Sequence, residues 1–372
     1  MNLVTLAVRN LRRRRLRTAL VSLSVGLAVA SALSLISLAA GIENSVREGV
    51  DERNADLTVL RRNASDIFSG FITDDLVGQI ARMPGVAAVA GDLIMFAPVD
   101  REQQKLVVGG QPDGFIWKSM PLIAGAMPPA GASRYAVLGA GAAEVLHKTV
   151  GDELTILDEP FRVVAIAGYQ SALDRSMIFV PLRDLQEIAF RQAQITLLYI
   201  RLQSGIQPDQ VQALKESIAA IGPLLVTPTG QLLRHDRYVG VMRQVARTVS
   251  VIALVMGALS VLSTLLMAVQ ERTREIGIMM AIGWSRSRTM MSFVVEAIVI
   301  GAIGSVIGIA MSYAISYSFK NLPILGEMMS FHPQPALFPP TLAASIFLCA
   351  AGALYPAWRA AALNPADALR RF

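Results

Sequence analysis

Four long stretches without a charged residue constrain this chain more than any other feature of its sequence. They cover residues 18–42, 248–270, 297–319 and 337–355. A helix needs about 20 predominantly apolar residues to cross the hydrocarbon core of a bilayer, and each stretch is close to that length. Charged residues make up only 17% of the chain, which is low for a soluble protein. The sequence therefore predicts an α-helical membrane protein with four transmembrane helices.

Basic residues gather on one side of these stretches. Thirteen arginines lie in the segments 1–17, 271–288 and 359–372, which together hold three acidic residues, whereas the 320–336 loop carries only Lys320. By the positive-inside rule, both termini and the 271–288 segment are expected in the cytoplasm. The expected location is the cell inner membrane. The spans are placed at 18–42, 244–270, 289–319 and 337–358.

The arginine run RRRRLR at residues 12–17 has more than one interpretation. Such a run could bind nucleic acid, but directly before a span it is more typical of a topology anchor that contacts anionic membrane lipid. The first span could also be a signal peptide. Its apolar run is longer than the usual 7–15 residues, which favours an uncleaved anchor. With the arginine run interpreted as a topology anchor, no nucleic-acid partner is expected.

Residues 43–243 form a large insertion between the first and second spans and are expected outside the cytoplasm. This insertion holds 19 basic and 23 acidic residues, a composition typical of a soluble domain. Two strand–helix–strand patterns, from ADLTVL to DLIMF and from TLLYIRL to PLLVTPT, bracket it. We expect an α+β domain with two subdomains. An α/β subdomain would comprise 43–96 and 189–243, and a mostly β subdomain 97–188.

Candidate catalytic residues are missing from this pattern. His147, His235 and His332 are isolated, and the single cysteine, Cys349, lies in an apolar run. GAGAAE at 139–144 lacks the Lys-Ser/Thr of a phosphate-binding loop. No catalytic residue, metal or cofactor is therefore expected in the chain, and an enzymatic activity of its own is not predicted.

The segment 271–288 is a charged stretch between two apolar ones. Ile276, Met279, Met280 and Gly283 follow the i, i+3, i+4, i+7 spacing of one helix face, and Gly283 suits a helix end. The segment is thus predicted to be an amphipathic cytoplasmic helix. One interpretation is a docking helix for another protein, and the other is a connector whose apolar side rests on lipid.

Several motifs resemble one protein family along nearly the whole chain. MAVQERTREIGIMMAIGWSRS, followed by FVVEAIVIGAIGSVIG, is similar to the coupling-helix and third-span signature of the MacB/FtsX-like ABC transporter permeases. YPAWRAAALNPADALR resembles the closing motif of that family, and LAVRNLRRRRLRTALVSLSVGLAVA resembles its start. LIAGAMPP and the following AVLGAGAAEVLHKTVGDELTILDEPFRVVAIAGY are also similar, though less specific.

The resemblance implies a permease that works with an ABC ATPase, which binds the ATP and Mg. The chain shows no Walker A motif, so the ATPase is expected on a separate chain. A second permease, identical or related, and in some members a periplasmic adaptor or carrier, would be further partners. The implied ATPase-coupling helix comprises Glu271, Arg272, Thr273, Arg274, Glu275, Ile276, Gly277 and Met280.

The same resemblance points to residues in the third and fourth spans. Glu296 matches the acidic residue of the third-span motif, and intramembrane acids usually face protein partners. Gly301, Gly304 and Gly308 form a small-residue stripe suited to close helix packing. The C-terminal motif comprises Pro356, Arg359, Asn364, Pro365 and Leu369. Pro356 is expected to end or kink the fourth span, and Asn364 with Pro365 to start a short cytoplasmic helix near the ATPase.

Three functions remain open at this level. The chain could transmit movement for efflux or for lipid or lipoprotein export. It could instead activate a cell-wall hydrolase by FtsX-like transmembrane signalling, without transporting a substrate. A membrane-anchored sensor that has no ATPase is a weaker alternative. The external domain of about 200 residues favours transport, and the sequence does not identify the cargo.

Overall fold

The computed structural model describes residues 3–62, 64, 69–100, 103–129, 131–231, 237–320 and 333–363. The chain divides into two compact units, which are described separately. A helical unit comprises Met1–Ala39, Arg243–Phe319 and Phe331–Phe372, and an α+β unit comprises Ala40–Met242 and Lys320–Ser330.

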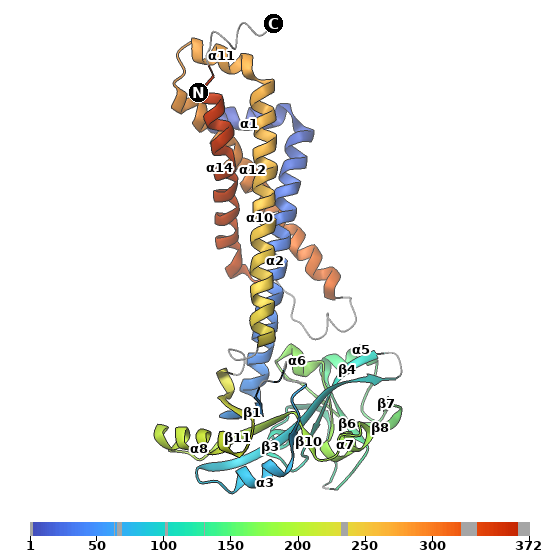
Figure 1. The fold of residues 1–372 in the computed structure, drawn as a ribbon. Coiled ribbons are helices and arrows are strands. Elements are labelled where there is room, and N and C mark those ends of the chain that lie inside the picture. The colour runs from blue at the N-terminus through green and yellow to red at the C-terminus, as the bar shows by residue number, and fades with distance from the viewer. Residues whose placement is uncertain are drawn as a thin grey trace. The chain divides into compact units, whose positions relative to one another are not determined.

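The helical unit contains the four predicted spans (Figure 1). Within the described residues, four helices are long and apolar enough to cross a membrane: Arg15–Gly49, Gly240–Glu271, Arg286–Ser318 and Pro335–Ala361. They belong to α2 (Arg15–Glu52), α10 (Arg237–Glu271), α12 (Arg286–Lys320) and α14 (Phe338–Ala361), the last preceded by the short 3-10 helix η2 (Pro335–Leu337). A separate helix, α1 (Leu3–Arg13), precedes α2. The prediction of four membrane-spanning helices is confirmed.

The 271–288 segment differs from the single helix that its pattern predicts. Helix α10 ends at Glu271, α11 covers only Thr273–Ala281, and α12 already begins at Arg286. The break lies at Arg272 (φ −107°, ψ 15°), and the Thr273 hydroxyl donates to the carbonyl oxygens of Val269 and Gln270 at 2.9 Å. Such back-bonding by threonine bends helices. Helix α11 therefore crosses the end of α10 instead of extending it (Figure 1).

Two glycine and proline predictions have different outcomes. Gly283 adopts a φ of +102° just beyond α11, the left-handed conformation that terminates helices, as predicted. Pro356, in contrast, does not end the fourth span, because α14 continues to Ala361. Prolines are tolerated inside membrane helices when neighbouring groups compensate for the lost hydrogen bond, and Pro356 is buried here. Asn364, Pro365 and Leu369 lie outside the described residues.

Glycines set the distance between α2 and α12. A methyl group on Gly308 would lie 2.6 Å from Cβ of Val29 and 2.7 Å from the carbonyl oxygen of Gly26. A methyl group on Gly304 would lie 2.6 Å from Val25. The stripe predicted from the sequence thus packs against α2 at these two positions, where small residues let helix backbones approach closely. The third glycine, Gly301, instead faces Cys349 on α14.

Replacing Gly308 with leucine is expected to separate α2 from α12. Overpacking of this kind costs about 1–3 kcal/mol, so the thermal unfolding midpoint of the full chain in lipid nanodiscs should fall by several degrees. The matched control is Gly240→Leu in α10, because nothing lies within 4 Å of a side chain added there. Equal midpoints for the two variants would contradict the close approach.

The α+β unit is built on one ten-stranded sheet. Its strand order is β12-β1-β11-β3-β4-β9-β6-β8-β5, with β7 paired to β3 and β8. The strands are β1 (Leu57–Arg61), β3 (Val86–Val99), β4 (Gln103–Gly110), β5 (Leu122–Gly125), β6 (Tyr135–Gly139), β7 (Glu153–Ile156), β8 (Glu159–Ala167), β9 (Ile178–Pro181), β11 (Leu197–Leu202) and β12 (Leu224–Pro228). A separate two-stranded sheet pairs β2 (Ile72–Thr73) with β10 (Gln194–Ile195).

The two predicted strand–helix–strand patterns meet within this sheet. Strand β1 pairs antiparallel with both β11 and β12, and β11 pairs with the first half of β3. The second half of β3 pairs with β4, so one long strand joins the predicted α/β and mostly β parts. Helix α8 (Pro208–Ile221) begins with proline in its first turn, as its sequence indicates.

Helices cover both faces of the sheet. Buried residues of α3 (Asp75–Ala81), α5 (Ala140–Leu146), α7 (Leu182–Ile188) and α8 pack into the hydrophobic core on one face. The core on the other face includes Ile116 and Trp117 of α4 (Phe115–Lys118) and partly buried Leu173 of α6 (Ala172–Arg175). The predicted α+β fold of this domain is confirmed.

Candidate functional site

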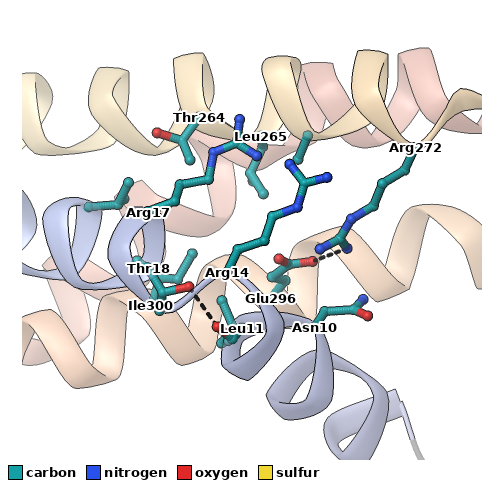
Figure 2. Close-up of a pocket in the computed structure, with 12 residues that line it drawn as sticks. Asn10, Leu11, Arg14, Arg17, Thr18, Thr264, Leu265, Arg272, Glu296 and Ile300 are labelled. Carbon is teal, nitrogen blue, oxygen red and sulfur yellow. Dashed lines mark hydrogen bonds and ion pairs between the residues drawn. The ribbon is translucent and has the colours of Figure 1, made fainter.

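Ion pairs connect the helix ends on the α11 side of the helical unit. Arg17 of α2 donates to Glu271, the last residue of α10, with 3.1 Å between Nη1 and Oε2, and Arg14 also forms an ion pair with Glu271. Arg272 extends toward Glu296 of α12, with 3.9 Å between Nη1 and Oε2 (Figure 2). The two carboxylates thus bind arginines from different parts of the chain.

The Arg272–Glu296 pair is largely removed from solvent, whereas the side chains that pair at Glu271 are partly exposed. The Arg272 and Glu296 side chains are 12% and 8% exposed. Arg14, Arg17, Arg272 and Glu296 line a cavity of about 20 Å³, which has room for one water molecule. Removing one partner of a poorly solvated ion pair leaves an uncompensated charge, so the Arg272–Glu296 pair favours one arrangement of the base of α11 against α12.

This arrangement changes the role expected for Glu271. The family resemblance places it in the ATPase-coupling helix, but the break at Arg272 leaves it on α10, where it pairs with Arg14 and Arg17. Glu271 and Arg272 therefore fix the base of α11 to α2 and α12. Glu296 has the protein partner expected of an intramembrane acid, although the sequence does not identify that partner as Arg272.

Among the residues that the structure describes, α11 packs into the helical unit through one face. Ile276 is 1% exposed and belongs to the core formed with α2, α10, α12 and α14, where Met279 and Met280 also pack. The opposite face exposes Arg274, Glu275, Ile278 and Ile282, the two isoleucines at 44% and 74%. Exposed isoleucines beside charged residues are a surface suited to another protein.

The predicted coupling residues therefore fall into two groups. Arg274 and Glu275 lie on the exposed face, whereas Ile276, Gly277 and Met280 support the helix from its packed side. Ile278 and Ile282 were missed by the sequence reasoning. Ile278 follows Arg274 by four residues and Ile282 follows Ile278 by four, and this spacing is the signal that could have found them, because residues four apart share one helix face. Of the C-terminal motif, Pro356 is buried and Arg359 is exposed.

Among the described residues, no group of three His, Cys, Asp or Glu side chains could hold a metal ion. The geometry of the helical unit is that of a membrane protein with an ion-paired helix base and one partly exposed surface helix. Such an arrangement offers a surface on which another protein can dock.

These features define a multi-pass membrane protein with an α+β domain between its first and second spans. Residues 18–217 match the MacB-like periplasmic core domain, and residues 247–365 match the FtsX-like permease C-terminal domain. The chain belongs to the MacB/FtsX-like family of ABC transporter permeases.

Similar proteins include the macrolide export ATP-binding/permease protein MacB of Chromobacterium violaceum, at 27% identity over 96% of this chain and 58% of that protein. The protein of the same name from Rhodopirellula baltica is 24% identical over 99% of this chain and 62% of its own length. The chain thus spans about three fifths of the curated relatives that it matches.

Two solved structures are similar to the α+β unit. The match to the periplasmic region of MacB from Actinobacillus actinomycetemcomitans covers 51% of this chain and 96% of that structure, with a TM-score of 0.41 and 12% identity. The match to the extracellular domain of the noncanonic ABC-type transporter YknZ from Gram-positive bacteria covers 47% of this chain and all of that structure, with a TM-score of 0.38 and 14% identity.

Proposed function

We propose that this chain is the permease subunit of an ABC transporter and that it couples ATP hydrolysis by a separate ATPase chain to movement of its α+β unit. The observation that carries the proposal is the two-faced packing of α11. One face is anchored by Ile276, and the other exposes Arg274, Glu275, Ile278 and Ile282. An ATPase docked on the exposed face would act directly on the ion-paired helix base.

Through the ion pairs of Glu271, movement of α11 would reach both α10 and α2. Glu271 joins α10 to Arg14 and Arg17 at the start of α2, so displacement of α11 acts on both helices together. Helices α2 and α10 are also the two elements that lead into and out of the α+β unit. Neither contains an internal proline, which suits helices that transmit force.

The orientation follows from charge. With α11 and the arginine-rich segments on the cytoplasmic side of the inner membrane, the α+β unit would lie outside the cytoplasm. We propose export or extraction of an apolar or lipidated substrate as the outcome, because relatives are named for macrolide export. Two permease chains, each with one ATPase, would form the active assembly.

The test reverses two charges on α11. In Arg274→Glu/Glu275→Arg, the net charge and the buried face are unchanged, but the docking face presents the wrong pattern. When the variant is purified with its ATPase in nanodiscs, the rate of permease-dependent ATP hydrolysis should fall at least about tenfold, because like charges that meet at an interface cost several kcal/mol.

The matched control is Lys215→Glu/Glu216→Lys on α8 of the α+β unit, a like exchange of two adjacent charges. This control should hydrolyse ATP at the wild-type rate. Wild-type hydrolysis by the α11 variant, with the ATPase still bound, would show that α11 is not the coupling element.

A further inference from the structure

A buried arginine fastens the end of α2 to a distant part of the α+β unit. Arg53 follows the last residue of α2 and is 9% exposed. Its guanidinium donates to both carboxylate oxygens of Asp174, with distances of 2.6 Å from Nη2 and 3.1 Å from Nη1. Nη1 also donates to the carbonyl oxygen of Gly49 at 2.7 Å. Paired arginine–carboxylate hydrogen bonds are both strong and directional.

Three further hydrogen bonds join the same two segments. The Glu52 carboxylate accepts from the backbone N–H groups of Gln170, at 2.7 Å, and Ser171, at 3.3 Å. The Ser171 hydroxyl donates to the carbonyl oxygen of Ser45 at 2.8 Å. The last turns of α2 are therefore bound along their length to the segment 170–174.

Gly49 makes this close approach possible. A methyl group at this position would collide with Oδ2 of Asp174 and would lie 3.1 Å from Nη1 of Arg53 and 3.2 Å from Oγ of Ser171. Glycine is a poor helix former, and its presence within α2 is explained by the absence of a side chain on the contact face.

The contact connects parts of the sheet that the chain order keeps apart. Beyond Arg53 the chain enters β1, which pairs with β11 and β12. Segment 170–174 instead follows β8 and leads through α6 to β9. In the strand order, β11, β3 and β4 lie between β1 and β9. Helix α2 is therefore joined to the sheet at two separate places, covalently next to β1 and through Arg53 next to β9.

We propose that Gly49, Arg53 and Asp174 form a latch that makes the end of α2 and the whole ten-stranded sheet move as one body. Without the latch, three hydrogen bonds of Glu52 and Ser171 and residues 54–56 would alone join the end of α2 to the sheet, and α2 would turn more freely about residues 54–56. The three residues act by positioning. The proposal rests on the proposed function in one respect: only if α2 moves during transport does the latch transmit force.

The test measures distances in the full chain by double electron–electron resonance in nanodiscs, with Cys349→Ala as background. One label pair, at exposed Glu48 on α2 and exposed Glu153 on β7, spans the latch. A second pair, at Lys215 and Glu153, lies wholly within the sheet domain. The test variants are Gly49→Ala, which keeps every charge, and Asp174→Asn; the matched control is Arg47→Ala on the exposed side of α2.

Both variants should widen the Glu48–Glu153 distance distribution at least twofold and leave the Lys215–Glu153 distribution unchanged. Arg47→Ala should alter neither. An unchanged Glu48–Glu153 width in Gly49→Ala and Asp174→Asn would overturn the latch, and so would widening of both pairs, which would indicate a general role in folding of the domain.

The hydrolysis assay separates this inference from the proposed function. If the charge reversal on α11 leaves the permease-dependent ATP hydrolysis at the wild-type rate, the proposed coupling fails. The label distances measured without nucleotide still decide whether the latch exists.

Discussion

Replacing Ile278 and Ile282 by aspartate is expected to release the ATPase from the chain while the helical unit stays folded. The two side chains are 44% and 74% exposed, so aspartate at these positions meets solvent in the free chain. Full burial of an isoleucine contributes about 1.5–3 kcal/mol, and the two introduced carboxylates would be desolvated on docking. The affinity for the ATPase should fall at least about 100-fold, which corresponds to about 2.8 kcal/mol.

Binding of the purified ATPase to the chain in nanodiscs measures this loss directly. The matched control is Ile123→Asp/Ile221→Asp in the α+β unit, because these isoleucines are also exposed, at 64% and 39%. The control should bind the ATPase with wild-type affinity. A similar affinity for the α11 variant and the control would place the docking surface elsewhere on the chain.

Much of the architecture follows from local sequence pattern. Each membrane span is a single uninterrupted apolar run, and length alone decides that such a run forms a spanning helix. The strands and helices around β1, α3 and β3 alternate with clear turn signals, and the same holds for β11, α8 and β12. Gly283 ends α11 because glycine adopts a positive φ without strain, and this property depends on the residue type alone.

The parts that sequence reasoning missed depend on contacts between distant residues. Glu271 and Arg17 are separated by 254 positions, and Arg53 and Asp174 by 121. No periodicity pairs them, because an arginine near a span is equally consistent with a lipid anchor. The break at Arg272 has a different, local origin. Threonine occurs in many helices, and nothing in the sequence pattern shows that the Thr273 hydroxyl bonds the carbonyl of Val269, four residues earlier.

Pro356 illustrates a local rule with two expected outcomes, an end or a kink, and the first is excluded because α14 continues past it. Proline ends most helices in water, but α14 lies among other apolar helices. Ala353, Ala357 and Ala360 are buried around it, and the helix continues for five residues. Packing on this face therefore maintains the helix despite the missing hydrogen bond.

Asp92 is the other buried carboxyl group near the latch, and it has a distinct environment. It lies on β3 where the strand's partner changes from β11, at Leu197, to β4, at Gly109 beside Leu93. The side chain is 2% exposed, and Oδ1 has no hydrogen-bond partner among the described residues. Burial raises the pKa of Asp92 from 3.8 to about 7; Arg53 opposes this shift and Asp174 adds to it.

The raised pKa makes the stability of the α+β unit depend on pH. Between about pH 4 and pH 7, the folded state holds a proton on Asp92 that the unfolded state has lost, so the free energy of unfolding falls as the pH rises. The fall is about 1.4 kcal/mol per pH unit and stops above the folded-state pKa. The ionisable groups that interact with Asp92 are Arg53, Asp174, Tyr169 and Tyr199.

Asp92→Asn is therefore expected to stabilise the α+β unit, and to do so more at pH 8 than at pH 5. The difference between the two gains should be about 3 kcal/mol, because asparagine keeps the size of the side chain and remains neutral. Hydrogen exchange of peptides from β3, corrected for the intrinsic effect of pH, measures the gain in the full chain. Exposed Asp113→Asn is the matched control and should give no gain at either pH. Equal gains at pH 5 and pH 8 for Asp92→Asn would mean that the carboxyl group of Asp92 does not take up a proton in this range, and that Arg53 neutralises both buried carboxylates at once.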